Sequence, residues 1–226
     1  MVRVSHWTSL PLASSASAIA ASALGNATEW FDYGIYAYGV TYISAALFPG
    51  NVDDAVLFAL ATFAISFLVR PLGGLFWGPL GDRMGRKAAL VTALMIMGVG
   101  TTLIGLLPTY ELIGPAAPIL LIILRFVQGF AIGGQWGGAM LLVTESAPAN
   151  KRGYYGAFAQ AGAPVGVILA NLAFLVISAT VSDEFFMTWG WRIPFILGLV
   201  IGPVGWYIRR CLPETHDAQS STGADH

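Results

Sequence analysis

Long apolar stretches, separated by short polar segments, dominate the chain. The stretches 88–107 and 157–181 contain no charged residue, and the stretches 57–81 and 116–143 contain one arginine each. A helix needs about 20 mostly apolar residues to cross a bilayer, and each of these stretches meets that requirement. The pattern therefore predicts a membrane-spanning helix at each of the four positions.

Two further stretches are less regular. The stretch 18–48 is long enough to cross a bilayer, although it contains two acidic residues. Residues 193–208 form a shorter apolar run, and aromatic residues typical of the membrane interface flank it, which places this span at 191–208. The predicted fold class is therefore all-α and integral to the membrane, with six transmembrane helices within residues 18–212.

The loops between the predicted spans indicate the orientation of the chain. Cytoplasmic loops carry an excess of Lys and Arg, and only Arg192 falls on the opposite side of the predicted spans. We therefore expect a plasma (inner) membrane protein with both termini in the cytoplasm, residues 1–17 forming a tail. Residues 213–226 would form a second polar tail or the start of a linker. The bases on the cytoplasmic side are Arg3, Arg83, Arg86, Lys87, Lys151, Arg152, Arg209 and Arg210.

The composition excludes several classes of protein. Charged residues make up 10% of the 226 residues, against about 25% in soluble domains, and the mean hydropathy is +0.71. The formal net charge of −1 supplies no basic face for a nucleic acid. The single cysteine, Cys211, excludes a disulfide framework, and without a Cys and His cluster we expect no metal and no other cofactor. All three histidines lie outside the predicted spans, which argues against an intramembrane hydrolase and against an enzyme.

Two carboxylates in the first predicted span are the strongest functional candidates. A charge inside a span costs about 2.5 kcal/mol or more on insertion scales. Glu29 and Asp32 are three residues apart and so share one helix face, which Tyr33 and Tyr36 extend. Two acids so close together cannot both ionise cheaply away from water, and proton coupling requires a carboxylate that changes its charge in the membrane. The alternative is that Glu29 lies near the cytoplasmic interface and stays hydrated.

The fourth predicted span supplies a complementary charge. Arg125, Gln128 and Gln135 fall on approximately one helix face. Arg125 cannot lose its charge, so it needs a partner, which is either Glu29 or Asp32 or an anionic group of a substrate. The alternative is an ion pair that only positions helices.

Other residues of the spans are open between a role in helix packing and a role in a functional site. Gln160 is a candidate for the lining of a cavity, with a simple interhelical hydrogen bond as the alternative. Arg70, followed by Pro71, is ambiguous between snorkelling to the interface and capping a kink. Gly129 and Gly133, at a spacing of four, predict a helix surface that lets a neighbouring backbone approach closely.

The segment between the second and third predicted spans carries a distinctive motif. The segment reads Gly78-Pro-Leu-Gly-Asp82-Arg83-Met-Gly85-Arg86-Lys87. This order resembles the signature loop of the major facilitator superfamily, in which Gly is followed after three residues by Asp-Arg and then, after one more, by Gly-Arg-Lys. In such a loop the glycine permits close packing, the aspartate holds an arginine or a helix N-terminus, and the bases keep the loop in the cytoplasm.

Further segments resemble one branch of that superfamily, the metabolite:proton symporters. These segments are 25–33, 125–129, 133–139, 151–153 and 190–195. Members of the branch import small carboxylates or zwitterions. The branch usually has Glu where this chain has Gln135, so a proton or cation role of that position is not carried over, whereas Glu29 and Asp32 are retained.

The resemblance implies twelve helices in two six-helix halves that surround a central cavity and rock to give alternating access. This chain corresponds to the N-terminal half, a fragment of such a carrier, so we expect a second six-helix half, either the missing C-terminal half or another subunit. The expected function is secondary active transport, coupled to protons, of a small organic anion or zwitterion across the lipid bilayer. A homodimeric six-helix half-transporter or channel is the alternative.

The same resemblance suggests roles for the residues singled out above. Asp32, together with Glu29, is the prospective proton site. Arg125 is either the counter-ion of these acids or the clamp for a substrate carboxylate. The polar lining of the cavity is expected to include Gln128, Gln135, Tyr36 and Gln160.

Overall fold

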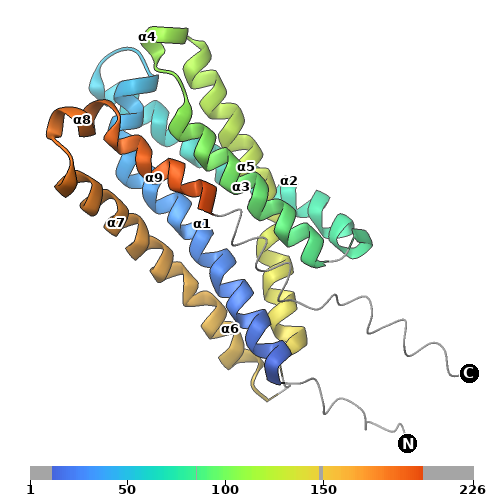
Figure 1. Ribbon diagram of the computed structural model, residues 1–226. Coiled ribbons are helices and arrows are strands. Elements are labelled where there is room, and N and C mark those ends of the chain that lie inside the picture. Colours follow the sequence, from blue (N-terminus) through green and yellow to red (C-terminus); the bar gives the residue numbers. More distant parts are fainter. Residues whose placement is uncertain (1–11, 85, 148–149, 201–226) are drawn as a thin grey trace, which may run out of the picture.

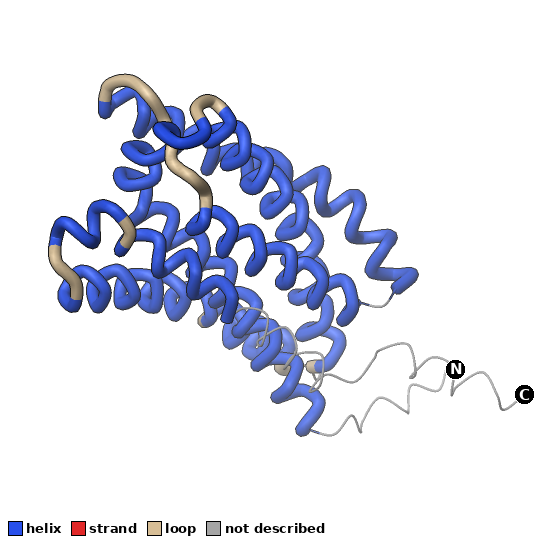
Figure 2. The backbone as a smooth tube through the Cα atoms, turned by 45° about the horizontal axis from the view of Figure 1, so that its top comes forward, coloured by secondary structure: helices blue, strands red, loops and turns tan. Residues whose placement is uncertain are grey.

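The computed structural model describes residues 12–84, 86–147 and 150–200. Every regular element within these ranges is a helix, and Figure 2 shows only short loops between them. The predicted all-α fold is thereby confirmed. The long helices lie side by side along one direction of the molecule (Figure 1). They are α1 (Leu12–Leu47), α2 (Val52–Met84), α3 (Arg86–Leu106), α5 (Ala116–Ser146) and α7 (Gly162–Thr180).

Short helical segments connect and extend the long helices. One of them, α6, lies at the lower end of the bundle in Figure 1, and α4 and α8 lie at the upper end. The segments are α4 (Tyr110–Ile113), α6 (Arg152–Gln160), α8 (Asp183–Thr188), η1 (Gly190–Arg192), α9 (Ile193–Ile196) and η2 (Leu197–Val200).

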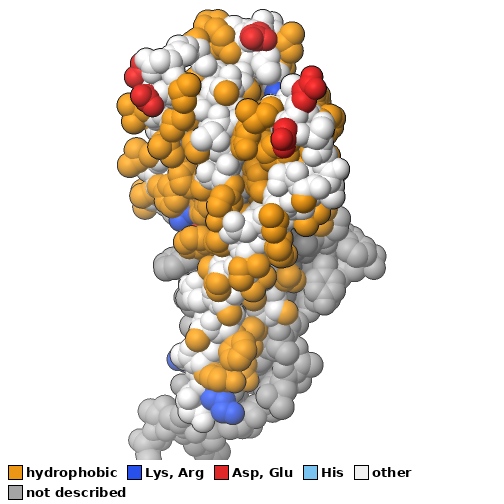
Figure 3. Space-filling view, turned by 90° about the vertical axis from the view of Figure 1, so that its left-hand side faces the viewer, with side chains coloured by type: hydrophobic (Ala, Val, Ile, Leu, Met, Phe, Trp, Pro, Cys, Tyr) orange, Lys and Arg blue, Asp and Glu red, His pale blue; other side chains and the backbone are white. Residues whose placement is uncertain are grey.

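The surface of the bundle is suited to lipid. Four segments of the described chain are long and apolar enough to cross a membrane: Val52–Arg83, Ala88–Leu106, Ala116–Gly134 and Arg152–Thr180. Hydrophobic side chains cover much of the face in Figure 3, and the acidic side chains in that view lie at its upper end. A multi-pass membrane protein has this distribution, because lipid contacts the apolar belt and water contacts the ends.

The helices depart from the expected ranges in two places. First, α1 begins at Leu12, inside the segment expected to be a tail, and α2 and α3 extend to Met84 and from Arg86 where a loop was expected. Second, the stretch 157–181 divides into α6 and α7 at Ala161. Pro164 explains this break, because proline lacks an N–H group and its ring crowds the carbonyl four residues earlier, that of Gln160.

Two close helix crossings determine where the polar side chains of the interior lie. In one, Gly129 and Gly133 of α5 face the backbone oxygens of Ser66 and Arg70 in α2, so closely that a Cβ atom on either glycine would overlap them. In the other, glycines of α7 meet the backbone of α1 in the same way. The predicted close packing at Gly129 and Gly133 is thus present, and it brings α2 and α5 together around α1.

A buried arginine, Arg192, holds the C-terminal end of α3 in place. The Arg192 guanidinium Nη1 donates hydrogen bonds to the backbone oxygens of Gly105 and Leu107, at 2.9 and 2.6 Å. Carbonyl groups in the last turn of a helix lack intrahelical partners, so this arginine satisfies them and ties η1 to α3. Its partners are therefore backbone groups, and it belongs to the frame of the fold.

Candidate functional site

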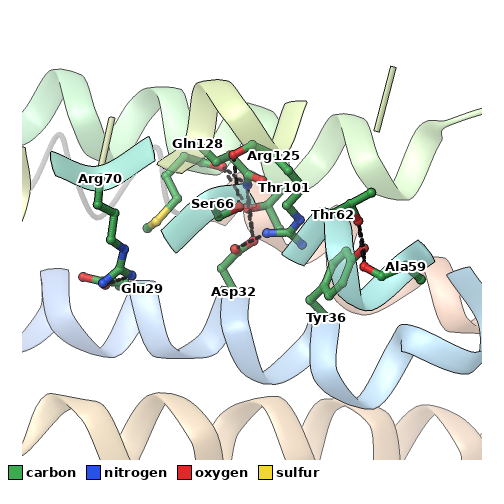
Figure 4. A network of polar contacts seen from close by, with 11 residues as sticks. Glu29, Asp32, Tyr36, Ala59, Thr62, Ser66, Arg70, Thr101, Arg125 and Gln128 are labelled. Atoms are coloured by element: carbon green, nitrogen blue, oxygen red, sulfur yellow. Dashed lines mark hydrogen bonds and ion pairs between the residues drawn. The ribbon is translucent and has the colours of Figure 1, made fainter. Parts of the chain in front are cut away.

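The two acidic residues of α1 are both buried inside the bundle. Glu29 and Asp32 have residue exposures of 3% and 0%. Each carboxylate contacts a different arginine, Arg70 of α2 for Glu29 and Arg125 of α5 for Asp32. Figure 4 shows the two ion pairs following one another along α1.

The Asp32–Arg125 pair is completely enclosed. The Arg125 Nη1 atom lies 2.8 Å from Asp32 Oδ2, and neither side chain has any exposed surface. Thr101 of α3 donates a hydrogen bond to Asp32 Oδ1 at 2.6 Å, and the Gln128 amide approaches the same oxygen at 3.3 Å. Both carboxylate oxygens therefore have donors, and the residues that donate to them come from two helices, α3 and α5.

The guanidinium of Arg125 is incompletely satisfied. Its Cζ atom lies 3.9 Å from the centroid of the Tyr36 ring, which supplies a cation–π contact. Its Nε and Nη2 atoms are buried and have no hydrogen-bond partner among the described residues. The Tyr36 hydroxyl in turn lies 2.9 Å from the Ala59 backbone oxygen and 2.6 Å from the Thr62 hydroxyl. Asp32 is thus the carboxylate that balances the charge of Arg125. Loss of the charge on Asp32 would therefore leave the arginine buried without a counter-charge.

The Glu29–Arg70 pair differs because it reaches the surface. Arg70 Nη2 lies 2.6 Å from Glu29 Oε1, and the exposed fractions of the two side chains are 27% and 4%. The Arg70 guanidinium also lies over the rings of Tyr33 and Phe67, at 5.0 and 4.6 Å from their centroids. One ion pair is therefore sealed within the bundle and the other is open on one side.

The structure brings together most of the residues that the sequence singles out for the site. Glu29, Asp32, Tyr36, Arg125 and Gln128 lie in or beside the two ion pairs (Figure 4).

Two predicted residues lie apart from this group. The Gln160 side chain accepts a hydrogen bond from Asn26 of α1 at 3.0 Å, in a separate contact between α6 and α1. The backbone of Gln135 belongs to α5, whereas its side chain lies outside the described part of the molecule.

The signature segment lies at the junction of α2 and α3. Gly78, Asp82 and Arg83 belong to the last turns of α2. Gly85 lies outside the described residues, as do the side chains of Arg86 and Lys87, which begin α3.

Several residues of the site were not identified from the sequence. Arg70 is the main one, since the sequence left it between a snorkelling role and a kink. Its position in α2, within an otherwise apolar span, was the available signal. Thr101, Thr62 and Ser66 are hydroxyl residues of apolar helices, and single hydroxyls in such helices usually bond their own backbone, as Thr101 also does to Met97.

The enclosed pair suits charge-coupled chemistry. Asp32 and Arg125 balance one another's charge, so removal of either charge would leave the other buried without a counter-charge. Among the described residues, no group of three His, Cys, Asp or Glu side chains could hold a metal ion.

Comparison with known proteins supports the assignment of this chain to the membrane transporters. Residues 18–218 match the family model described as sugar (and other) transporter. The inner membrane metabolite transport protein YhjE of Escherichia coli is 48% identical over 207 residues, which cover 91% of this chain and 47% of that protein. The proline/betaine transporter of E. coli is 46% identical over 200 residues, covering 88% of this chain and 40% of that protein.

A solved structure gives the same result for the fold. The proton:xylose symporter XylE of the major facilitator superfamily superimposes with a TM-score of 0.81 at 17% identity, covering 95% of this chain and 48% of XylE. The chain thus spans about half the length of the proteins that it matches. On the match to the family model, this chain belongs to the sugar (and other) transporter family.

Proposed function

We propose that the chain forms the first six-helix half of a secondary transporter that couples protons to the uptake of small carboxylates or zwitterions. Relatives that are named metabolite and proline/betaine transporters support a small solute of this kind. The solute would be carried by alternating access, in which two halves rock about a central site. A second six-helix half, whether a further part of the same protein or another subunit, would complete that site.

One observation carries the coupling proposal, the sealed Asp32–Arg125 pair. A symporter needs a group that binds a proton from one side of the membrane and releases it to the other. Asp32 is suited to this task because Arg125 is its one charged partner at 2.8 Å and neither side chain is exposed. Protonation would free Arg125 and loosen the contact between α1 and α5, which links proton binding to a change in helix packing.

The remaining candidate residues take supporting roles in this proposal. Gln128 and Tyr36 would hold Asp32 and Arg125 in position, since both contact the pair. Glu29 is the second proton candidate, and Gln135 and Gln160 would contribute polar groups to the lining. The basic signature segment would lie in the cytoplasm, and both termini would lie on the same side.

The substitution Asp32→Asn tests the proposal in proteoliposomes that contain the assembled carrier. Uptake of labelled glycine betaine driven by a pH gradient should be abolished, because an amide cannot bind and release the coupling proton. Exchange of internal for external solute should continue, because exchange requires no net proton movement.

The exposed Glu111 of α4 provides a matched acid far from the pair, and Glu111→Gln should accumulate solute as the wild type does. Accumulation by the Asp32→Asn variant at the wild-type level would overturn the coupling proposal. The mass of the denatured polypeptide from native membranes separates a chain with a distinct second half from the alternative of a homodimer, because the homodimer dissociates into chains of 23.9 kDa and a polypeptide with both halves stays about twice as large.

A further inference from the structure

The Arg70 guanidinium occupies a cation site built from other residues of the chain. The rings of Tyr33 and Phe67 are stacked, with centroids 5.1 Å apart, and Arg70 Cζ lies 5.0 and 4.6 Å from them. The guanidinium carbon and the two ring centroids therefore form a nearly equilateral triangle, and the Glu29 carboxylate lies 2.6 Å from Arg70 Nη2. A carboxylate beside two aromatic rings is an environment that favours a positive group of any origin.

This site borders the surface, unlike the Asp32–Arg125 pair. Phe67 and Trp30 have exposed fractions of 44% and 41%, and Trp30 contacts the edge of Tyr33. The side chain of Arg70 is 27% exposed. A small molecule can therefore reach the rings and the guanidinium without unfolding of the bundle.

Polar groups at the site have unused hydrogen-bonding capacity. The Nε atom of Arg70 and the hydroxyl of Tyr33 are both buried, and neither has a hydrogen-bond partner among the described residues. Buried polar groups in native proteins are nearly always paired, so an unpaired donor next to an open ion pair indicates a ligand that completes it. The matching ligand group for a guanidinium is a carboxylate.

We propose that a short zwitterion binds by inserting into the Glu29–Arg70 ion pair. The positive group of the solute takes the place of the guanidinium against Tyr33, Phe67 and Glu29. The solute carboxylate binds the displaced Arg70. The inference rests on the proposed function, because it names the solute class and the binding residues of the proposed carrier.

Charge balance is the reason why a zwitterion fits better than a singly charged solute. A zwitterion replaces one ion pair by two, so neither Glu29 nor Arg70 loses its partner. A simple anion would bind Arg70 and leave the buried Glu29 carboxylate unpaired, and a simple cation would leave Arg70 unpaired. A charge that is left buried without a partner is unfavourable, so the Glu29–Arg70 pair disfavours the binding of a simple anion and of a simple cation.

Three probes of nearly equal shape test the inference on the assembled carrier that contains this chain, purified in lipid nanodiscs. Glycine betaine carries both charges, choline carries only the quaternary ammonium group, and 3,3-dimethylbutanoate is the carbon isostere of betaine with only the carboxylate. Binding is measured with labelled betaine and by competition with the other two. The wild-type carrier should bind betaine saturably and should bind the other two at least about tenfold more weakly.

Substitutions at the pair should change the preference and not only the affinity. Glu29→Gln should weaken betaine binding by about tenfold and allow dimethylbutanoate to compete, since no carboxylate is then left unpaired. Arg70→Gln should weaken betaine binding to a similar extent and allow choline to compete. A misfolded variant cannot gain a ligand, so these gains separate recognition from damage to the fold.

The ring contribution has a matched control. Phe67→Leu should weaken betaine binding by about threefold, through loss of a cation–π contact. Phe58 is also an exposed phenylalanine of α2, but it lies near the start of the helix, where it stacks on Phe48. The substitution Phe58→Leu should therefore leave betaine binding unchanged.

Two results would overturn the inference: no saturable betaine binding by the wild-type carrier, or equal competition by all three probes in every variant. Binding requires no pH gradient, so the outcome is independent of proton coupling. Betaine binding without proton-driven accumulation would contradict the proposed function alone, and Asp32-dependent accumulation without binding at Glu29 and Arg70 would contradict the inference alone.

Discussion

The two ion pairs on α1 are one helical turn apart and have different surroundings. Asp32–Arg125 is sealed between three helices, with neither side chain exposed and with Thr101 and Gln128 as further donors to the carboxylate. In the Glu29–Arg70 pair the arginine is 27% exposed. Two aromatic rings lie against this arginine, where the enclosed pair has further polar side chains. The same pair of residue types thus occurs once in a closed polar network and once at an aromatic surface.

The two proposals above assign a different task to each pair. A proton can reach a sealed carboxylate through small rearrangements of hydrogen bonds, whereas a solute with several heavy atoms cannot. In these proposals the surface pair exchanges its partners with a solute, whereas the sealed pair exchanges only its proton. The following predictions test whether burial, and not the identity of the charged groups, separates the two pairs.

The largest effect is expected from Arg125→Met. This change leaves the Asp32 carboxylate buried without a counter-charge, which costs about 3–5 kcal/mol of stability. The apparent melting temperature in mild detergent should fall accordingly. The double variant Asp32→Asn/Arg125→Met should recover part of the loss, because the unpaired charge is removed. Additive losses in the double variant would show that the pair is not the source of the effect.

The next effect is expected where the helices cross. Gly129→Ala places a methyl group against the Ser66 backbone oxygen, so α2 and α5 must separate, at a cost of about 1–3 kcal/mol. Both ion pairs depend on this crossing, because Ser66 donates to the Arg125 backbone oxygen at 3.0 Å and Arg70 lies one turn further along α2. Gly78→Ala is the matched control, since nothing lies within 4 Å of its added Cβ atom. A melting temperature that falls equally in both variants would contradict this account of the crossing.

A smaller effect is expected from Arg70→Met, the counterpart of Arg125→Met at the open pair. Arg70 is 27% exposed, whereas Arg125 is completely enclosed, so the cost should be smaller than at the enclosed pair, about 1–2 kcal/mol. The same detergent melting experiment compares the two substitutions directly. Equal losses for Arg70→Met and Arg125→Met would mean that burial does not distinguish the pairs.

The smallest effect is expected from Tyr36→Phe. The phenyl ring still covers the Arg125 guanidinium, and only the hydroxyl contacts with Ala59 and Thr62 are lost. The expected cost is about 1 kcal/mol, measured as a small decrease in melting temperature. A loss as large as that of Arg125→Met would show that the hydroxyl network, and not the charge pair, holds α1 in place.

Sequence reasoning predicted the fold class, and it singled out the charged residues within the spans, because both depend on local signals. Apolar stretches of about 20 residues predict helices, and charges within them are conspicuous. The spacing of Glu29 and Asp32 correctly placed both on the interior side of α1. The signature segment between α2 and α3 indicated a transporter family from the residues alone, and the family model that matches residues 18–218 is a transporter family.

The pairing of charges could not be predicted in the same way. The sequence left open whether Glu29 or Asp32 meets Arg125, because the choice depends on how α2 and α5 cross. Glycine contacts between those helices place Arg70 opposite Glu29 and Arg125 opposite Asp32. The break at Ala161 was likewise a consequence of Pro164 acting within an otherwise continuous apolar stretch.

The most direct test of the division of tasks follows protons and solute together. A gradient of glycine betaine is imposed across proteoliposomes that contain the assembled carrier, and a trapped dye reports the internal pH. The wild type should move protons with the solute, Asp32→Asn should move solute without protons, and Glu29→Gln should move little of either. Solute-driven proton movement in the Asp32→Asn variant at the wild-type rate would contradict the assignment of the proton to the sealed pair.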